Sequence, residues 1–212
     1  MQLEELRREY LQGGLERADL DDDPLVQFER WLAQAMQLGV NDPTAMTVAT
    51  VDAQGQPSQR VVLLKHVDNN GFVFYTNLDS RKALELGTNP KTSLHFPWHQ
   101  IDRQVKVRGV AERIPAAVAL AYFASRPRES QLAAWASAQS RPISSRQFLL
   151  QQFAAMKKRF SEGHIPLPDR WGGYRVVPHA IEFWQGGAHR LHDRFEFVKS
   201  TGADWSVARL AP

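Results

Sequence analysis

The stretch from Ala45 to His66 reads AMTVATV DAQG QP SQRVVLLKH, and it decides the fold of this 212-residue chain. β-Branched and apolar residues dominate Ala45–Val51 and Ser58–His66, and the residues Asp52–Gly55 between them favour a turn. Two such runs around a short turn are typical of a β-hairpin. Within the second run, Val61–Leu64 is continuously apolar, which predicts a strand buried on both faces.

Outward from this hairpin, the pattern predicts further strands at 72–76, 92–96, 103–114, 174–177, 180–184, 191–199 and 205–210. A helix is predicted to begin at Pro24, with Asp23 as its N-cap, and to end near Gly39. A short helix is predicted at 80–86, and three more at 115–125, 129–138 and 144–160. Short antiparallel strands around a helical insertion predict an α+β fold, a β-barrel with peripheral helices.

The composition narrows the class of protein. The 43% of hydrophobic residues suits one domain with a substantial core or two small ones, and the net charge of +3 is too balanced to indicate a nucleic-acid partner. With no Cys, disulfides, thiolate catalysis and Cys-ligated metals are excluded. Met1–Tyr10 carries no secretory signal, and no apolar run approaches the roughly 18–20 residues that cross a bilayer, so we expect a cytoplasmic protein without a membrane partner.

Two groups of basic residues lie on a predicted strand or directly after one. Arg60 and Lys65 stand at the two ends of the apolar run, where they either reach into a cleft or extend into water as ordinary strand-end charges. Ser80, Arg81 and Lys82 lie in the first turn of the predicted short helix. Helix N–H groups beside two cations suit a phosphate monoester, although capped helix starts without a ligand are common.

A third group belongs to the helical insertion. Tyr122 and Arg126 are four residues apart and so share one helical face, and Ser130 follows the break at Arg126–Arg128. The phenol, guanidinium and hydroxyl groups together can hydrogen-bond a second phosphate. An exposed amphipathic face explains the same pattern equally well.

The fourth group lies in the segment from Trp184 to Phe195. Gly186 and Gly187 predict a tight turn, after which Arg190, His192 and Arg194 alternate along the predicted strand and share one face. Three cationic or titratable groups on one face repel one another unless an anion lies against them. This segment is therefore the strongest indication of a ligand site in the sequence.

Other kinds of chemistry find no support. The seven His residues show no ligand pair with a nearby carboxylate, so no metal site is predicted. Neither a nucleophile elbow of the Gly-x-Ser-x-Gly type nor a dinucleotide-binding Gly-x-Gly-x-x-Gly motif is present. The chemistry would have to come from an organic cofactor held by cationic side chains.

A series of short motifs, in order and spacing, is similar to the pyridoxine/pyridoxamine 5′-phosphate oxidase family over essentially the whole chain. They are Leu6–Tyr10, Asp42–Met46, Arg60–Lys65, Phe74–Asn77, Ser80–Lys82, Phe96–Trp98, Ser125–Arg128, Trp171–Gly173, Trp184–Phe195 and Arg209–Pro212. The resemblance implies an antiparallel FMN-binding split β-barrel of Greek-key type at residues 21–212, with the helical insertion at about 115–160 and a mobile N-terminal lid at 1–20. It also implies a homodimer with FMN at the interface.

The implied reaction is oxidation of pyridoxine 5′-phosphate or pyridoxamine 5′-phosphate by O₂, through hydride transfer from C4′ to flavin N5. The products are pyridoxal 5′-phosphate and H₂O₂, with ammonia from the amine. Two alternatives remain: a split-barrel flavin reductase-like protein with another substrate, and a non-enzymatic pyridoxal-phosphate carrier. The first would not need the phosphate-binding residues Lys65, Tyr122, Arg126 and Ser130 together, and the second would not need the flavin-binding residues. The presence of both sets favours the oxidase.

The resemblance also assigns roles to individual positions. The cofactor-binding positions are Arg60, Val61, Lys65, Tyr75, Thr76, Arg81, Lys82, Gln104, Gln139, Ser140, Trp184 and Arg194. The substrate-binding positions are Arg7, Tyr10, Asp42, Lys65, Tyr122, Arg126, Ser130, Arg190 and His192. Arg190 and His192 would form the catalytic pair against the pyridine ring. Gln139, Ser140, Trp184 and Arg194 are expected from the partner subunit.

Overall fold

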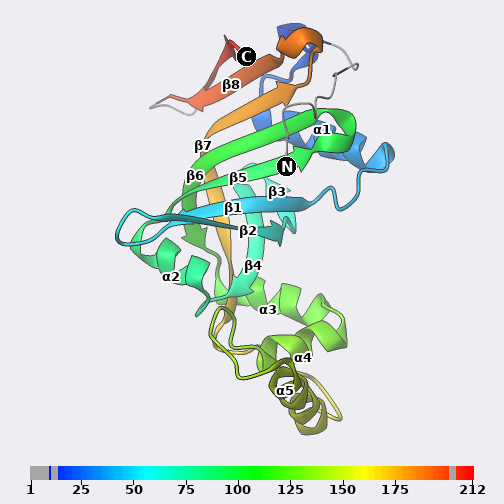
Figure 1. Ribbon diagram of the computed structural model, residues 1–212, viewed down its shortest axis with the longest axis vertical. Helices are drawn as coiled ribbons and strands as arrows, with labels where there is room; N and C mark the ends of the chain where they lie inside the picture. The colour runs from blue at the N-terminus through cyan, green and yellow to red at the C-terminus, as the bar shows by residue number, and fades with distance from the viewer. Residues whose placement is uncertain (1–9, 11–13, 201–203) are drawn as a thin grey trace, which may run out of the picture.

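The computed structural model of the protein describes residues 10, 14–200 and 204–212, and Figure 1 shows the order of its elements. The strands are β1 (Ala45–Val51), β2 (Pro57–Leu63), β3 (His66–Asp68), β4 (Gly71–Asn77), β5 (Lys91–Trp98), β6 (Arg103–Arg113), β7 (Trp171–Gln185), β8 (Asp193–Lys199) and β9 (Trp205–Leu210). The helices are α1 (Pro24–Gln37), α2 (Arg81–Thr88), α3 (Ala116–Ser125), α4 (Arg128–Ala136) and α5 (Arg146–Arg159). Short 3₁₀ turns are η1 (Arg17–Asp19), η2 (His99–Ile101) and η3 (Ala188–Arg190).

All nine strands join one antiparallel sheet, which confirms the predicted antiparallel β-barrel with peripheral helices. The main path runs β2-β1-β5-β6-β7-β4-β3, and β8 and β9 extend it from the second half of β7. The predicted hairpin is present, since β1 and β2 pair in register from Ala45 opposite Leu63 to Val51 opposite Pro57. The sheet curls, so that β2 and β4 contact each other although they are not hydrogen-bonded neighbours.

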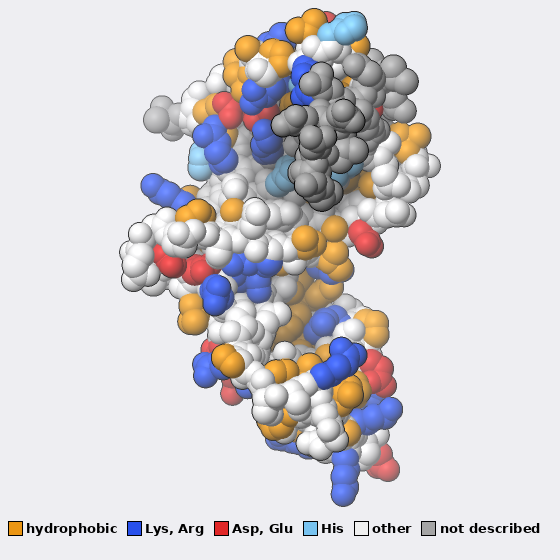
Figure 2. Space-filling view, viewed as in Figure 1, with side chains coloured by type: hydrophobic (Ala, Val, Ile, Leu, Met, Phe, Trp, Pro, Cys, Tyr) orange, Lys and Arg blue, Asp and Glu red, His pale blue; other side chains and the backbone are white. Residues whose placement is uncertain are grey.

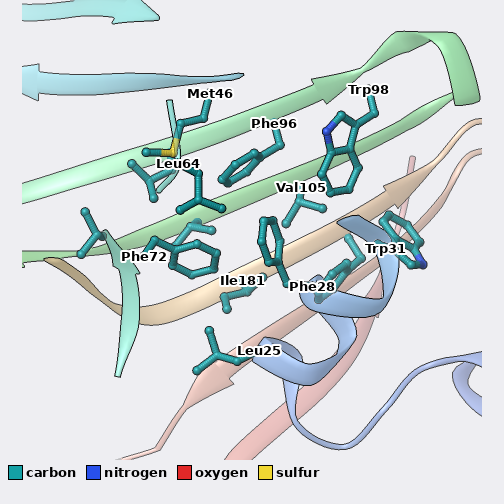
Figure 3. Close-up of a cluster of buried hydrophobic side chains, with 14 of the residues drawn as sticks. Leu25, Phe28, Trp31, Met46, Leu64, Phe72, Phe96, Trp98, Val105 and Ile181 are labelled. Carbon is teal, nitrogen blue, oxygen red and sulfur yellow. The ribbon is translucent and has the colours of Figure 1, made fainter. Parts of the chain in front are cut away.

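Helix α1 supplies the centre of the core. Asp23 caps it as predicted, because the carboxylate accepts a hydrogen bond from the backbone N–H of Leu25 at 2.8 Å, and Pro24 occupies the first turn. The fully buried Phe28 packs against Phe72 and Phe96 of the sheet, with ring centroids 4.9 and 4.8 Å apart. Figure 3 shows this cluster between α1 and the sheet.

Helices α3, α4 and α5 form a second unit with its own small core. Phe123, Leu132 and Ile165 are buried there against Trp171, the first residue of β7. Figure 1 shows this unit at one end of the molecule, while the end of β7 and the strands β8 and β9 lie at the other. Strand β7 therefore connects the two ends.

Residues 14–20 are packed against the main core rather than detached from it. Leu15 and Leu20 are buried, and the backbone N–H of Leu15 donates to the carboxylate of Asp193 at 3.0 Å. Of the predicted lid, Tyr10 is described, whereas residues 1–9 and 11–13, including Arg7, lie outside the described residues. No helix among the described residues is long and apolar enough to cross a membrane.

Three predicted strands were wrong in extent. The predicted strands 174–177 and 180–184 are parts of one strand, β7, because a β-bulge opposite Arg108 and Gly109 accommodates Pro178 without ending the strand. The predicted strand 58–66 ends at Leu63, and β3 begins separately at His66.

The prediction that Val61–Leu64 is buried on both faces was also wrong. Strand β2 lies at an edge of the sheet, and 68% of Val61 and 43% of Leu63 are exposed, while Leu64 alone is fully in the core. A run of apolar residues is compatible with a central strand that is buried on both faces. It is equally compatible with an edge strand whose outer face contacts another chain, so the run alone does not distinguish the two.

Candidate functional site

A cleft of about 870 Å³ lies between the sheet and the helical unit, and we call it the basic cleft. Its lining brings together residues from β2, β4, α2, α3 and α4 with the loop that follows α4. Figure 2 shows Lys and Arg side chains gathered at this waist of the molecule. The predicted site residues in its lining are Arg60, Val61, Lys65, Tyr75, Thr76, Arg81, Lys82, Tyr122, Arg126, Ser130, Gln139 and Ser140.

Lys82 is the most deeply buried cation of the basic cleft. Only 6% of it is exposed, and its Nζ donates to Thr76 Oγ1 at 2.8 Å, Gln139 Oε1 at 3.1 Å and Ser80 Oγ at 3.2 Å. All three of these acceptors are uncharged. Burial, helped by the nearby Arg60, lowers the pKa of Lys82 to about 8. An ammonium held in this way is available to an anionic ligand.

Arg60 reaches the same place from β2. Its guanidinium donates to Thr50 Oγ1 at 2.5 Å and Ser58 Oγ at 2.7 Å, and it lies 3.4 Å from the carboxylate of Glu85 on α2. Burial acts to raise the pKa of Glu85, but the hydrogen bonds from Thr50 and Ser58 and the charge of Arg60 outweigh it and lower this pKa. Glu85 is therefore a buried carboxylate that holds Arg60 at the cleft wall.

The other end of the basic cleft is aromatic and cationic. Tyr75 and Tyr122 stack with ring centroids 3.9 Å apart, and Tyr75 also stacks on Trp171 at 5.3 Å. The Arg126 guanidinium lies 5.1 Å from the Trp171 ring, and its buried Nη1 has no hydrogen-bond partner among the described residues. Burial lowers the pKa of Arg126. This arginine is fixed by packing while one of its donors points to no protein acceptor.

Lys65, Arg81 and Ser130 also belong to the lining. Both cations are exposed, and Ser130 is half-buried in the first turn of α4. In all, five basic residues and no carboxylate stand among the described residues that line the basic cleft. A cleft with this charge suits an anion, and its two separate cationic ends suit two phosphate groups.

A second group of predicted residues lies at the far end of β7. His192 packs between Tyr10, at 5.1 Å between ring centroids, and Trp184, at 4.6 Å, and these three residues form what we call the aromatic corner. Tyr10 and Trp184 also meet edge to face at 5.7 Å. Arg190 is exposed beside it, in η3.

The prediction that Arg190, His192 and Arg194 alternate along one strand was wrong. Residues Ala188–Arg190 form a 3₁₀ turn, and β8 begins only at Asp193. His189 and Arg190 have φ angles of 55° and 62°, a left-handed conformation in which no strand can continue. Of the three residues, only Arg194 lies in a strand. Arg190 lies in the 3₁₀ turn, and His192 lies between that turn and β8.

Gln104, Trp184 and Arg194 stand directly opposite one another across β6, β7 and β8, and so share one face of the sheet. On this face the guanidinium Nε of Arg194 donates to Glu182 at 2.9 Å, and His95 lies 3.0 Å from the Gln104 amide oxygen. Gln104 and Arg194 line a cleft of about 550 Å³ there. Burial opposes ionisation of Glu182, yet Arg194 and Lys106 together lower its pKa.

The predicted site is therefore divided between two places in one chain. The basic cleft lies beside the helical unit, with Trp171 at the start of β7 in its lining. The aromatic corner and the row of Gln104, Trp184 and Arg194 lie at the other end of β7, and Figure 1 shows the two ends of this strand far apart. Gln139 and Ser140 were expected from the partner subunit. Within one chain both line the basic cleft, and Gln139 accepts a hydrogen bond from Lys82 of its own chain. Asp42, with a φ of 47°, lines neither place.

Sequence reasoning missed several residues of the site. Trp171 closes the aromatic end of the basic cleft, and only its place in a Trp-Gly-Gly motif indicated it. Three further residues contact predicted site residues: Glu85 contacts Arg60, Glu182 contacts Arg194, and His95 contacts Gln104. Nothing in the sequence around a single carboxylate or imidazole predicts such a contact. These three residues become visible only through hydrogen bonds between residues that are distant in the sequence.

Solved structures show the same fold. The chain superposes with a TM-score of 0.89 on PhzG from Burkholderia lata, solved in complex with tetrahydrophenazine-1-carboxylic acid, at 29% identity over 97% of this chain and 100% of that one. An FMN-binding protein from Nostoc punctiforme that is related to pyridoxamine 5′-phosphate oxidase gives a TM-score of 0.73 at 14% identity, over 91% of this chain and 100% of that one.

Sequence comparisons extend over the full length. Pyridoxine/pyridoxamine 5′-phosphate oxidases from Pseudoalteromonas translucida and Teredinibacter turnerae are each 62% identical to this chain, and the one from Vibrio campbellii is 59% identical, with both chains covered completely in each case. The model of the pyridoxamine 5′-phosphate oxidase family matches residues 32–160, and that of the pyridoxine 5′-phosphate oxidase C-terminal dimerisation region matches residues 171–212. This chain belongs to the pyridoxine/pyridoxamine 5′-phosphate oxidase family.

Proposed function

We propose that this chain is an FMN-dependent oxidase that converts pyridoxine 5′-phosphate or pyridoxamine 5′-phosphate and O₂ to pyridoxal 5′-phosphate and H₂O₂. One observation carries the proposal beyond the family match: the basic cleft has two cationic ends, and each has a buried donor group that no protein anion satisfies. Lys82 has only uncharged acceptors, and Arg126 Nη1 has no acceptor among the described residues. A flavin phosphate and a substrate phosphate match these two ends.

The residues around Lys82 fit FMN. Lys82, Arg60 and Arg81 supply charge for its phosphate, while the Thr76 and Gln139 side chains supply neutral hydrogen-bonding groups beside it. We assign to FMN, on one chain, Arg60, Val61, Lys65, Tyr75, Thr76, Arg81, Lys82, Gln139 and Ser140. A flavin bound by these residues would supply a hydride acceptor for C4′ of the substrate and a route for the electron pair to O₂.

The residues around Arg126 fit the substrate phosphate. Tyr122 from α3, Arg126 just after α3 and Ser130 from α4 all line the cleft, as does Lys65 from the link between β2 and β3. Stacking on Trp171 and Phe123 fixes the guanidinium, so little side-chain entropy is lost when it binds. This clamp orients the substrate ring so that C4′ faces the cofactor.

The second set of residues reaches the same site from a partner subunit. The dimerisation model covers residues 171–212, which include Trp184 and His192 of the aromatic corner and also Arg194. In a two-fold dimer every contact between the chains is formed twice, so a basic cleft that meets the partner's aromatic corner gives two shared sites. We propose that the partner's Gln104, the partner's Trp184 and the partner's Arg194 contact the flavin, and that the partner's Arg190, the partner's His192 and the partner's Tyr10 enclose the substrate.

The function is tested by an aerobic assay of FMN-loaded protein with pyridoxine 5′-phosphate, in which aldehyde and peroxide are both measured. We expect a yellow protein with about one FMN per chain and equal amounts of aldehyde and H₂O₂. Protein that fails to take up FMN contradicts the proposal. Protein that binds FMN but forms no aldehyde from either phosphate ester supports instead a split-barrel flavoprotein with another substrate.

The phosphate clamp gives a separate prediction. Arg126→Ala should raise KM for pyridoxine 5′-phosphate by about 10–100-fold, from the roughly 1.5–3 kcal/mol of a charge-assisted hydrogen bond. The flavin content should remain unchanged because Lys82 is at the other end of the cleft. Arg146→Ala, which removes an exposed arginine from the first turn of α5, is the matched control. An unchanged KM in Arg126→Ala would mean that the phosphate lies elsewhere.

A further inference from the structure

The turn that carries His192 fixes which ring nitrogen holds the proton. The backbone N–H of Gly187 donates to His192 Nδ1 at 3.1 Å. A backbone N–H can only donate, so Nδ1 must present its lone pair and carry no proton. The neutral imidazole then has its proton on Nε2, at the opposite edge of the ring.

The backbone of this turn leaves little freedom to break that hydrogen bond. A Cβ on Gly187 would lie 2.2 Å from the carbonyl oxygen of Leu191, so only glycine permits the turn to close. His189 and Arg190 both have a left-handed backbone, which non-glycine residues adopt at a cost of the order of 1 kcal/mol each. Such a conformation is retained where the position of the following side chains matters.

The surroundings of the ring also favour its neutral form. Tyr10 stands at 90° to the ring and Trp184 at 41°, so the two aromatic side chains hold the imidazole plane. Among the described residues, the charged groups that act on its pKa are Arg190 in η3 and Asp193 at the start of β8. Burial and Arg190 lower the pKa of His192, and Asp193 opposes them only in part. The carboxylate of Asp193 is already shared with the Leu15 N–H and the Arg209 guanidinium.

We propose that the Gly187 N–H locks His192 as the neutral Nε2–H tautomer, so that His192 acts on the substrate as a fixed hydrogen-bond donor and not as a base. Gly187 is the positioning residue in this arrangement, and it acts through its backbone. A base would need a lone pair on Nε2, which this tautomer lacks. The identity of the acceptor as a substrate atom rests on the proposed function; the tautomer itself does not.

The tautomer is measured directly by ¹⁵N NMR of the histidine rings in FMN-loaded, substrate-free protein at neutral pH. The His192 signals are identified by their absence from the spectrum of His192→Gln. We expect Nδ1 with the shift of an unprotonated nitrogen and Nε2 with that of a protonated one. A proton on Nδ1, or an averaged pair of shifts, would overturn the proposal, and neither result depends on whether the protein oxidises anything.

Two matched variants test the donor role. The Gln amide reaches the position of Nε2 and can donate there, whereas the Asn amide reaches only the position of Nδ1 and can accept from Gly187. We expect His192→Gln to retain about tenfold more kcat/KM than His192→Asn, with equal FMN content in both, since one such hydrogen bond is worth roughly that factor. Equal or better activity in His192→Asn would contradict a donor at Nε2.

The pH profile supplies the third readout. Protonation at Nδ1 replaces the acceptor by a second donor that faces the Gly187 N–H, so the turn loses its hydrogen bond in the cationic form. Because the pKa of His192 lies below that of free histidine, kcat/KM should be constant at neutral pH and fall only on the acidic side. His192→Gln should lack this acidic decline. An increase in kcat/KM on acidification would show that the cation is the active form.

Discussion

Replacing Arg190 by alanine is expected to lower kcat/KM by about 100- to 1,000-fold, the usual effect of removing a fixed charged group from a reacting site. The side chain is exposed, and its backbone has a φ of 62°, so this arginine serves no purpose in the core. It stands beside His192 at the aromatic corner, where a planar guanidinium can cover the substrate ring. Steady-state kinetics with pyridoxine 5′-phosphate measure the loss.

The flavin content of Arg190→Ala should equal that of the wild-type protein, because the cationic residues around Lys82 belong to the basic cleft at the other end of β7. Arg190→Lys separates charge from shape: an ammonium keeps the charge but cannot stack as a plane, so we expect it to restore only a small part of kcat/KM. If Arg190→Ala loses FMN and keeps its KM, Arg190 contacts the cofactor and our assignment is wrong.

Lys82→Met is expected to weaken FMN binding by about 30- to 5,000-fold, which corresponds to the 2–5 kcal/mol lost when one partner of a buried charge pair is truncated. Methionine fills similar volume, so the fold should persist. Fluorescence quenching of added FMN measures the affinity. Lys91→Met, at an exposed position of β5, is the matched control and should bind FMN normally.

The same variant predicts a change in pH dependence. The pKa of Lys82 is lowered to about 8 without ligand, and a bound phosphate must raise it, because the phosphate favours the ammonium form. FMN affinity of the wild-type protein should therefore decline as the pH rises above about 8. Lys82→Met should show no such decline. A parallel decline in both proteins would mean that another group holds the phosphate.

Much of the fold was predictable because local patterns and the final structure agree. The Asp23–Pro24 start of α1 and the β1–β2 hairpin follow from residues that are adjacent in the sequence. The basic cleft was also largely predictable, since Arg60 lies in a recognisable strand, and Lys82 and Arg126 each lie at a recognisable helix boundary. The errors lie where contacts between residues distant in the sequence determine the position or length of a strand. Nothing local reveals that β2 is an edge strand or that a bulge carries β7 past Pro178.

The turn around Arg190 shows a different limit. Polar alternation favoured a strand, but two residues with left-handed backbones followed Gly187, and only tertiary packing at the aromatic corner explains them. The assignment of Gln139 to the partner subunit met a related limit. A residue's match to a ligand contact does not say which chain of a symmetric dimer supplies it, whereas the hydrogen bond shows that Gln139 lies beside Lys82 of its own chain.

The central claim is that each active site combines the basic cleft of one chain with the aromatic corner of another, and heterodimers test it most directly. Chains with Lys82→Met and chains with Arg190→Ala are co-expressed with different tags, isolated as heterodimers and assayed at an FMN concentration that saturates only the wild-type protein. One site of each heterodimer is then intact, so we predict about half of the wild-type activity per dimer.

The reciprocal heterodimer, one wild-type chain paired with one chain that carries both substitutions, has both shared sites damaged and should be nearly inactive. If each site lay within a single chain, the outcomes would be reversed: the first heterodimer would be no more active than its parent homodimers, and the reciprocal one would retain about half of the wild-type activity. That reversal would contradict the account.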